Sequence, residues 1–535
     1  MIATSASQAV LAHTCGTNAE CAANAGTTCT VTCSESDLRS ALAVVNACGG
    51  HRTIKFDFGT CGCGACPTCA ISVLNTDTTA TCGSQSYAMC LTGDSITIDG
   101  SNASGTVGPT FHYGGDVPCA SCSGNCSGPQ PALFVIRGNG NTVKNIGLEF
   151  FPEDIHVDSG NQHTISGITE RYYCEEALDI NGGTNVVVQN STFVGATDPE
   201  AEQATKLCYK QRETAPPSSQ TIPCTTDANC GGMCSGSGGN CSVDTDCFTG
   251  ETCTPLTGQH CHCFDGTFAS APPNNGTCLI GFSSGTCYRK SLCGLDKAIQ
   301  VNAGSLSVTG NSFTNTQTAL LLTNANGSIT ATVSKNQVTG SSTDVILASE
   351  PTFRIEADDV CHGMVATGAT TTASFVSNTI AQCKYGLRAT QGAVLHATWN
   401  TIHDDYVSAI RVEDASTITG SFNRFKNNGT SPPLSGDQGR GAIVIADVNA
   451  TVDFGNRFVA NGEKGLNVFC GAHWSVFDIV SPSSAVCPGA VVAAQRNCFE
   501  SGEQIADPYG KVDDTYHGAV GIDPLCLDYN LTCTF

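Results

Sequence analysis

The sequence is poor in charged residues, and cationic residues are especially scarce. Only 13% of its 535 residues are charged, about half the usual share, and 24 Lys and Arg stand against 47 Asp and Glu. Phosphate groups are bound by clustered cations, so a net charge of −23 without any Lys/Arg-rich stretch argues against a nucleic-acid partner. Anionic membrane surfaces repel such a chain for the same reason.

Long apolar runs are also missing. No stretch approaches the roughly 18 apolar residues that span a bilayer, and the longest, such as residues 319–322, are short. We therefore predict no membrane insertion. The first Lys or Arg is Arg39, so the N-terminus lacks the charged and apolar segments of a signal peptide. We expect an export signal to be absent from this sequence.

Cysteine, by contrast, is abundant. A reducing cytosol prevents disulfide formation, so 34 Cys predict disulfides and a secreted protein, extracellular or at a cell surface. Fourteen Cys fall in 15–126, twelve in 208–293 and five in 470–533. We expect disulfides in these regions, and zinc binding by segments 61–69 and 260–263 is the less favoured alternative.

Between the Cys-rich regions the sequence repeats with a period of about 22 residues. A second series, a small residue followed by an aliphatic one, runs in phase with the first, as in Ala177-Leu178 and Ala298-Ile299. Two short strands in each unit would stack coil upon coil, which predicts an all-β fold, a right-handed parallel β-helix. The turn markers of the first series are Asn145, Gly167, Asn190, Asn311, Asn336, Asn378, Asn400, Asn423 and Asn456.

The spacing predicts five segments. A Cys-rich N-terminal region with capping coils (1–130) includes an amphipathic helix over 36–45, which would cover the first coil. The first part of the β-helix (131–199) precedes a Cys-rich insertion (200–293), and the second part (294–469) precedes a disulfide-stapled C-terminal region (470–535). The insertion is also a candidate surface for self-association or cell-surface contact.

Alignment of the coils on the small-aliphatic step converts sequence offsets into columns of stacked side chains, spaced about 4.8 Å apart. Outward-facing carboxylates of adjacent coils would then form one patch, typical of a Ca²⁺ site. The patch consists of Glu175, Glu176, Asp179 and Asp296. Positive charge lies on the same face, at Lys297 and farther along at Lys384, Arg388 and Arg411. Such a face is suited to an acidic polysaccharide.

Two segments resemble the family-three pectate lyases. Cys174-Glu-Glu-Ala-Leu-Asp-Ile180 is similar to that family's Cys-Glu-Asp-Ala-Leu, and Asp296-Lys-Ala-Ile-Gln-Val-Asn302 to its Asp-Lys-Val-x-Gln-His-Asn. The resemblance implies that Glu175, Glu176 and Asp296 hold calcium and that Lys297 is basic and faces the substrate. It also implies β-elimination, in which a base removes the proton beside a uronate carboxylate.

This chain lacks the Gly-Lys and Arg-Ser-Cys-Gly segments that the family carries in its next coil. Residues from a more distant coil would therefore supply the base or bind the substrate, and the candidates are Arg354, His362, Arg388 and Arg411. We predict catalytic roles for Lys297, Arg388 and Arg411. Substrate contacts are predicted for Lys384, His362 and Arg354.

Two other functions stay open. A non-catalytic adhesin, sheath or filament subunit would suit the low charge and the Cys-rich insertion. A glycoside hydrolase of the polygalacturonase type would use paired Asp residues, for which Asp358-Asp359 and Asp404-Asp405 are the candidates, although consecutive strand residues face opposite ways. The simplest interpretation of Asp404-Asp405 is solubilising loop charges. The glycan and the disulfide connectivity are not determined by the sequence.

Overall fold

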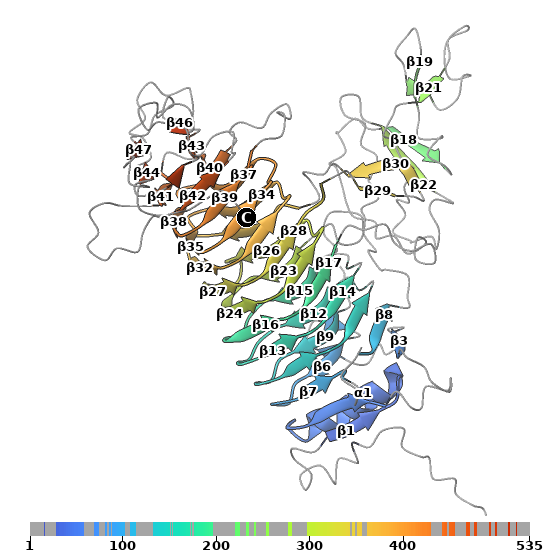
Figure 1. Cartoon of the computed structure of the whole chain (residues 1–535). Helices are drawn as coiled ribbons and strands as arrows, with labels where there is room; N and C mark the ends of the chain where they lie inside the picture. Colours follow the sequence, from blue (N-terminus) through green and yellow to red (C-terminus); the bar gives the residue numbers. More distant parts are fainter. Residues whose placement is uncertain are drawn as a thin grey trace, which may run out of the picture.

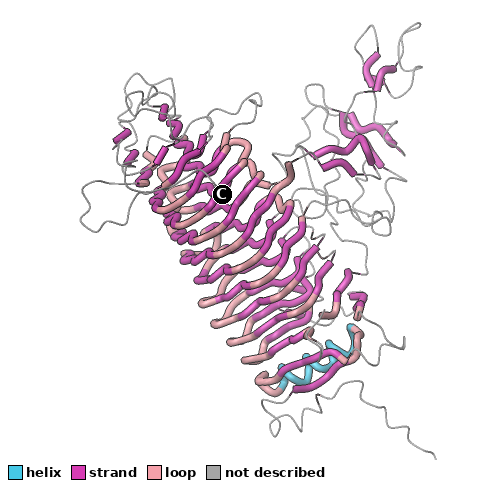
Figure 2. The backbone as a smooth tube through the Cα atoms, in the orientation of Figure 1, coloured by secondary structure: helices cyan, strands magenta, loops and turns pink. Residues whose placement is uncertain are grey.

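The chain is a right-handed parallel β-helix built from three long parallel sheets, as predicted (Figure 1). This computed structural model describes, with short gaps, residues 28–57, 69–113, 132–195, 297–355 and 361–454, together with Cys15, isolated strands between 220 and 280 and strands after 467. Figure 2 shows the strands stacked in successive turns along one axis.

The first sheet has fourteen strands, each hydrogen-bonded to the equivalent strand of the next coil. Its strands are β1 (Thr28–Val31), β2 (Thr53–Phe56), β7 (Thr97–Asp99), β10 (Thr142–Lys144), β13 (Thr164–Ser166), β16 (Val186–Gln189), β24 (Gly304–Thr309), β27 (Ile329–Ser334), β32 (Thr371–Val376), β35 (Val394–Thr398), β38 (Thr417–Ser421), β41 (Thr451–Asp453), β44 (Val492–Ala493) and β47 (Val520–Gly521).

The second sheet has twelve shorter strands. They are β3 (Ala70–Val73), β8 (Thr110–Tyr113), β11 (Gly147–Glu149), β14 (Thr169–Arg171), β17 (Thr192–Val194), β25 (Ser312–Thr314), β28 (Gln337–Thr339), β33 (Thr379–Ala381), β36 (Thr401–His403), β39 (Arg424–Lys426), β42 (Val468–Cys470) and β45 (Cys498–Phe499).

The third sheet, also of twelve strands, carries the small-aliphatic series. Its strands are β6 (Met89–Leu91), β9 (Ala132–Ile136), β12 (Glu153–Val157), β15 (Glu176–Ile180), β23 (Lys297–Val301), β26 (Thr318–Thr323), β31 (Met364–Thr367), β34 (Tyr385–Thr390), β37 (Ser408–Val412), β40 (Gly441–Ile445), β43 (Val476–Asp478) and β46 (Val512–Asp513).

Each complete coil therefore contains three strands, and the prediction of two was wrong. The first and second sheets are joined by a turn so short that their strands look like one segment in sequence. In the coil of β35 and β36, only Trp399 and Asn400 separate the two strands. Trp399 has a left-handed backbone (φ 60°), which redirects the chain within one residue.

Asparagines at this turn form a ladder through the interior. The Asn378 amide donates to Asn400 Oδ1 (3.0 Å), and Asn378 Nδ2 donates to both Asn400 Oδ1 (3.0 Å) and the Val333 carbonyl (2.9 Å). The same pattern runs through Asn311, Asn336, Asn378, Asn400, Asn423 and Asn467. The side-chain amides thus satisfy buried backbone groups at the turn, such as the Asn378 N–H and the Val333 carbonyl.

Two adjacent columns, not one, contain the predicted turn markers. Asn145, Gly167 and Asn190 have positive φ and occupy the left-handed position, one residue before the ladder. The equivalent residue in the next coil is Gly310, whose neighbour Asn311 begins the Asn-to-Asn ladder. Asn456 lies outside the described residues.

The interior is mainly apolar, and its hydrophobic core is continuous from the N-terminal coils to β41. Phe193 and Phe313, separated by 120 residues in sequence, stack with ring centroids 4.9 Å apart and planes 7° apart. The predicted capping helix is confirmed as α1 (Glu35–Ala47), which begins at the N-cap Ser34 and buries Leu38 and Leu42 against the first coil. Within the described residues, no helix is long and apolar enough to cross a bilayer.

Among the described residues, four small antiparallel sheets lie outside the three long ones. They are β4 (Thr81–Cys82) with β5 (Gln85–Ser86), β18 (Gln220–Cys224) with β22 (Gly276–Ile280), β19 (Gly232–Cys234) with β20 (Asn240–Cys241) and β21 (Cys253–Pro255), and β29 (Val345–Leu347) with β30 (Glu350–Ile355). The segment 200–293 separates β17 from β23, yet β15 pairs directly with β23. The insertion therefore leaves the stacking uninterrupted.

Disulfides occur both in the N-terminal region and between coils of the β-helix. The described pairs are Cys15–Cys29, Cys33–Cys69, Cys82–Cys90 and Cys361–Cys383. The last joins residues 22 apart in sequence, one coil to the next. Cysteines thus also staple neighbouring coils, and Cys69, a candidate zinc ligand, is disulfide-bonded.

Candidate functional site

The outward face of the third sheet gathers polar residues from three successive strands. In β15, Ala177, Leu178 and Ile180 enter the apolar core, so Glu176 and Asp179 lie on the other side of the sheet. We call the group formed there the carboxylate–histidine cluster. It consists of Glu153 and His156 from β12, Glu176 and Asp179 from β15, and Lys297 from β23.

Strand register brings these residues together. Glu153 pairs with Glu176, and Glu176 pairs with Lys297, although 121 residues separate the last two. In the neighbouring column, His156 pairs with Asp179. The register of Asp179, Gln300, Leu321, Val365, Arg388 and Arg411 agrees with the column derived from the sequence.

His156 lies between two carboxylates. Its Nδ1 is 3.3 Å from Glu153 Oε2 and 3.2 Å from Asp179 Oδ2. Burial alone would lower the pKa of His156, but hydrogen bonds and charge from Asp179 and Glu153 outweigh this effect and raise the pKa to about 10. The imidazole is therefore protonated at neutral pH and can donate a proton.

The pKa of Glu153, which faces His156, is also raised above its usual value. Burial raises its pKa, the hydrogen bond and charge of His156 oppose this shift, and the nearby Asp179 and Glu176 add to it. The side chain of Lys297, 26% exposed, donates from Nζ to Glu176 Oε1 at 2.6 Å. Lys297 is thus the cluster member that a ligand reaches most readily.

Two asparagines hold Asp179 in place. Asn181 Nδ2 donates to Asp179 Oδ2 at 2.5 Å, and Asn302 Nδ2 donates to Asp179 Oδ1 at 3.0 Å. Asn302 Nδ2 also donates to Asn181 Oδ1 (2.6 Å), so the two amides brace each other. Both follow the last residue of a third-sheet strand, β15 and β23. The carboxylate orientation is therefore fixed by the coils themselves.

The described residues do not form an oxygen cage for calcium. Glu153, His156 and Asp179 lie close enough to share an ion, each with one ligand atom within 4.8 Å of the others. However, one of the three is a protonated imidazole, and calcium prefers six to eight oxygens. Of the predicted calcium ligands, Glu176 binds Lys297, and Glu175 and Asp296 lie outside the described residues.

Arg388 and Arg411 lie on the same face but in a separate group. They pair across β34 and β37, and both bind Glu413, through Arg388 Nε–Oε2 (2.8 Å) and Arg411 Nε–Oε1 (2.5 Å). Their guanidinium carbons lie 5.6 and 5.3 Å from the Tyr385 ring centroid. β34 is three strands beyond β23, about 14 Å, so these arginines do not converge on Lys297.

The predicted substrate-binding residues do not join the cluster either. His362 and Lys384 precede β31 and β34, and the His362 ring lies 6.5 Å from that of Tyr385. Both therefore belong near the arginine group. Arg354 lies in β30, which pairs with β29 and not with the third sheet, and its side chain is outside the described residues.

The two hydrolase doublets do not form an active pair in the described residues. Asp404 is exposed and bonds to His403 Nδ1 at 2.7 Å. Asp405 is buried and accepts from the Cys383 amide at 2.9 Å. The interpretation of both as solubilising charges is therefore wrong for Asp405. Asp358-Asp359 lies outside the described residues.

Sequence analysis missed Glu153, His156, Asn181 and Asn302. In β12 the small residue of the small-aliphatic step is replaced by Asp154, so this coil was not aligned with the others. A usable signal was the sequence period itself, because Glu153 stands 23 residues before Glu176. The asparagines could have been found as the residues that follow Ile180 and Val301.

Comparisons with known proteins find only remote structural similarity. No protein-family profile and no curated protein sequence matches the chain. An alginate lyase from Paenibacillus sp. str. FPU-7 superposes with a TM-score of 0.37 and 11% identity, over 77% of this chain and 98% of that one. An endo-xylogalacturonan hydrolase from Aspergillus tubingensis gives 0.36 and 9%, over 92% and 100%.

A tailspike protein of E. coli bacteriophage HK620 gives a TM-score of 0.35 and 10% identity, over 91% of this chain and 62% of that one. Similarity at this level does not justify assigning the function of one protein to another. The fold assignment therefore stands on the topology of the three sheets.

Proposed function

We propose that the protein is an extracellular enzyme that cleaves an acidic polysaccharide by β-elimination at the carboxylate–histidine cluster. The observation that carries the proposal is that Lys297, bound to Glu176, lies on the same sheet face as His156, two strands away. The cluster thus supplies a cation for a substrate carboxylate, a carboxylate that can accept a proton and an acid that can donate one.

The reaction follows from these groups. A uronate carboxylate that binds Lys297 competes with Glu176 for Nζ, and this pairing acidifies the neighbouring C5 proton. Glu176, released from Lys297, accepts that proton, and the C5–H electrons form the C4=C5 double bond as the C4–O bond breaks. His156 donates a proton to the departing oxygen, so the charges and protons balance.

A requirement for calcium remains a prediction from the sequence. Two of its four expected ligands, Glu175 and Asp296, lie outside the described residues, and the described ones fit the ion poorly. No step is therefore assigned to a metal. Assays with added calcium and with chelator test the requirement directly.

The first prediction concerns Lys297. Lys297→Ala should lower kcat/KM on a uronan at least about 100-fold, because the substrate carboxylate loses its cation. Product formation is followed at 235 nm on polygalacturonate and alginate, and Lys335→Ala, at an exposed turn outside the third sheet, is the control. Full activity of Lys297→Ala would refute the role of this residue, and no signal on any uronan would refute the lyase.

Hydrolysis is the second candidate, and Glu153 favours it. Burial raises the pKa of Glu153, as a general acid requires, and a ligand oxygen of Asp179 lies within 4.8 Å. This separation is closer to the roughly 5–5.5 Å of retaining than to the roughly 6.5–9.5 Å of inverting glycosidases. New reducing ends without absorbance at 235 nm would identify a hydrolase. Absence of both products would favour the non-catalytic adhesive or structural role.

A further inference from the structure

We propose that the outward face of the first sheet binds a neutral polysaccharide, with Trp399 and Phe422 as its stacking platform. We call this surface, from β13 to β38, the hydroxyl face. It lies on a different sheet from the carboxylate–histidine cluster, so it is a binding surface additional to the proposed active site.

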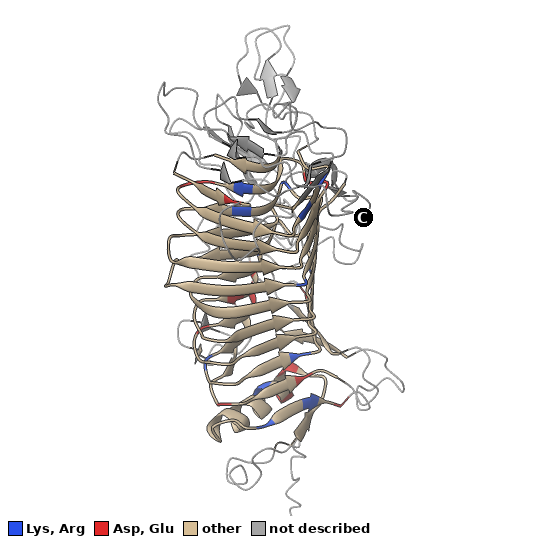
Figure 3. Cartoon of the chain, turned by 60° about the vertical axis from the view of Figure 1, so that its left-hand side comes forward, with Lys and Arg blue, Asp and Glu red and all other residues tan. Residues whose placement is uncertain are grey.

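The strands of the hydroxyl face carry no formal charge, and Lys335 is the exposed charge in the turn column at their edge. The seven strands, β13, β16, β24, β27, β32, β35 and β38, contain no Asp, Glu, Lys or Arg, and their outward residues are mostly Thr and Ser. The flanking strands bring Lys144 and Asp453. Figure 3 shows the central coils in tan, with most coloured residues toward the two ends.

Over the same coils, the charged side chains lie mainly on the third sheet, and the second sheet is uncharged from β17 to β36. Arg171 and Arg424 flank that uncharged part of the second sheet, whose strands are only three residues long, whereas the third sheet carries the cluster and the arginine pair. In a chain of net charge −23, a face without charge has nothing to bind an ionic partner. Each Thr or Ser hydroxyl can both donate and accept a hydrogen bond, which complements the hydroxyls of a sugar.

A pair of aromatic rings at the edge of this face points to the same class of ligand. Trp399 is 58% exposed, the only exposed large hydrophobic residue in the described part of the chain. Its ring lies parallel to that of Phe422, with centroids 4.4 Å and planes 5° apart. The two rings cover each other on one side, and the other flat face of the exposed Trp399 suits the apolar face of a sugar ring.

Backbone geometry supports a functional reason for these rings. Trp399 and Phe422 follow β35 and β38 at left-handed turn positions, with φ of 60° and 57°. Bulky side chains are rare there, and the equivalent positions in earlier coils hold Gly310, Lys335 and Ser377. The two rings are therefore not needed to form the turn.

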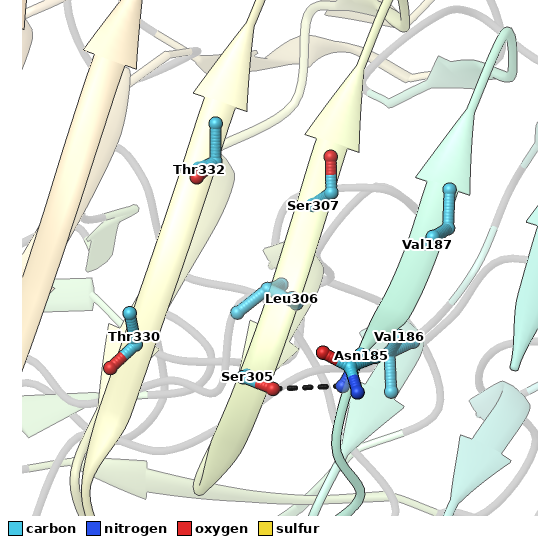
Figure 4. A pocket seen from close by; sticks show the side chains of 8 residues that line it. All are labelled: Asn185, Val186, Val187, Ser305, Leu306, Ser307, Thr330 and Thr332. Carbon is cyan, nitrogen blue, oxygen red and sulfur yellow. Dashed lines mark hydrogen bonds between the residues drawn. The ribbon is translucent and has the colours of Figure 1, made fainter. Parts of the chain in front are cut away.

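A groove opens at the other edge of the hydroxyl face. It has a volume of about 290 Å³ and crosses the amino-terminal ends of β16, β24 and β27. Ser305, Ser307, Thr330 and Thr332 line it, and the Ser305 hydroxyl accepts from the Asn185 amide at 2.8 Å (Figure 4). β24 and β35 are three strand steps apart, about 14 Å, so a chain-like ligand rather than a single sugar would contact both features.

Binding of the full-length protein to defined neutral polysaccharides tests the proposal. Affinity electrophoresis in mixed-linkage glucan and galactomannan, and sedimentation with cellulose, should show retention by at least one of them. Trp399→Ala should weaken that binding about tenfold, because a stacking surface is lost. Lys335→Ala, in the same turn column, should bind like the wild type.

A second variant places a charge in the centre of the face. Ser374→Lys in β32 should weaken binding, whereas Thr379→Lys, exposed on the second sheet, should not. Unchanged thermal unfolding confirms that each variant is folded. Retention of no neutral polysaccharide, or wild-type retention of both Trp399→Ala and Ser374→Lys, would overturn the proposal. A dimer in light scattering that Ser374→Lys dissociates would instead assign the face to self-association.

The two proposals can fail separately. Trp399→Ala should keep wild-type activity at 235 nm on short uronate oligosaccharides. Lys297→Ala should keep wild-type binding to the neutral polysaccharide. The hydroxyl face is therefore judged by retention alone, whatever the outcome of the lyase assay.

Discussion

At the scale of single residues, carboxyl groups occupy positions that the coil pattern reserves for uncharged side chains. Asp154 takes the place of the Ala in later coils and is fully buried with Glu170 and Tyr173. Burial raises the pKa of both carboxyl groups, and the charge of Asp154 raises that of Glu170 further. A buried pair of this kind retains a proton, so it differs in chemistry from the cluster on the outer face.

Asp405 is a second such carboxyl, in a ladder position between the second and third sheets. Its amide donates to Asn428 Oδ1 at 3.1 Å, as ladder asparagines do, but its own Oδ2 has no hydrogen-bond partner. Burial raises its pKa well above the usual range, the Cys383 amide opposes this shift, and the charge of Asp404 adds to it.

We expect Asp405→Asn to stabilise the protein at neutral pH. The folded state holds the proton of Asp405 more tightly than the unfolded state, so the free energy of unfolding falls as pH rises above about 4. An amide has no charge to bury and should add about 1–2 kcal/mol at pH 7. Thermal unfolding from pH 4 to pH 8 should show a weaker pH dependence than the wild type, and an unchanged dependence would contradict this account.

At the scale of the structural element, the Asn ladder holds the turn between the first and second sheets. Each inner asparagine contacts both neighbouring coils. Asn378 Oδ1 accepts from the amide and Nδ2 of Asn336, and its Nδ2 donates to the Val333 carbonyl on one side and to Asn400 Oδ1 on the other. Loss of one side chain therefore leaves several buried groups unpaired.

Asn378→Ala should lower the free energy of unfolding by about 3 kcal/mol, since each unpaired buried group costs about 1–3 kcal/mol. Thr379→Ala, at the exposed neighbouring position, should change it by less than about 0.5 kcal/mol. Denaturant titration of both variants measures the difference. Equal stability of the two would show that the ladder is dispensable.

At the scale of the whole molecule, the β-helix is independent of its large insertion. The strands on either side pair directly, β15 with β23, β16 with β24 and β17 with β25. Replacement of residues 200–293 by a short Gly/Ser linker should therefore preserve the circular-dichroism spectrum and the main unfolding transition. A variant without cooperative unfolding would show that the insertion is part of the folding unit.

The sequence determined the repeat, and with it much of the architecture. The 22-residue period, the turn asparagines and the small-aliphatic step predicted a β-helix, the column from Asp179 to Arg411 and the capping helix, because coils of equal length must stack in register. The third strand was hidden, because its turn leaves only two residues between strands.

Only the tertiary structure decided the composition of the candidate site. Lys297 and Glu176 are 121 residues apart and form an ion pair, while Arg388 and Arg411 share the predicted face but bind Glu413 instead. His156 was missed because Asp154 breaks the pattern of its coil. The raised pKa of His156 depends on Glu153 of its own strand and on Asp179 of the neighbouring strand. A sequence pattern fixes which residues share a column, whereas charge, burial and partner choice depend on how neighbouring coils pack.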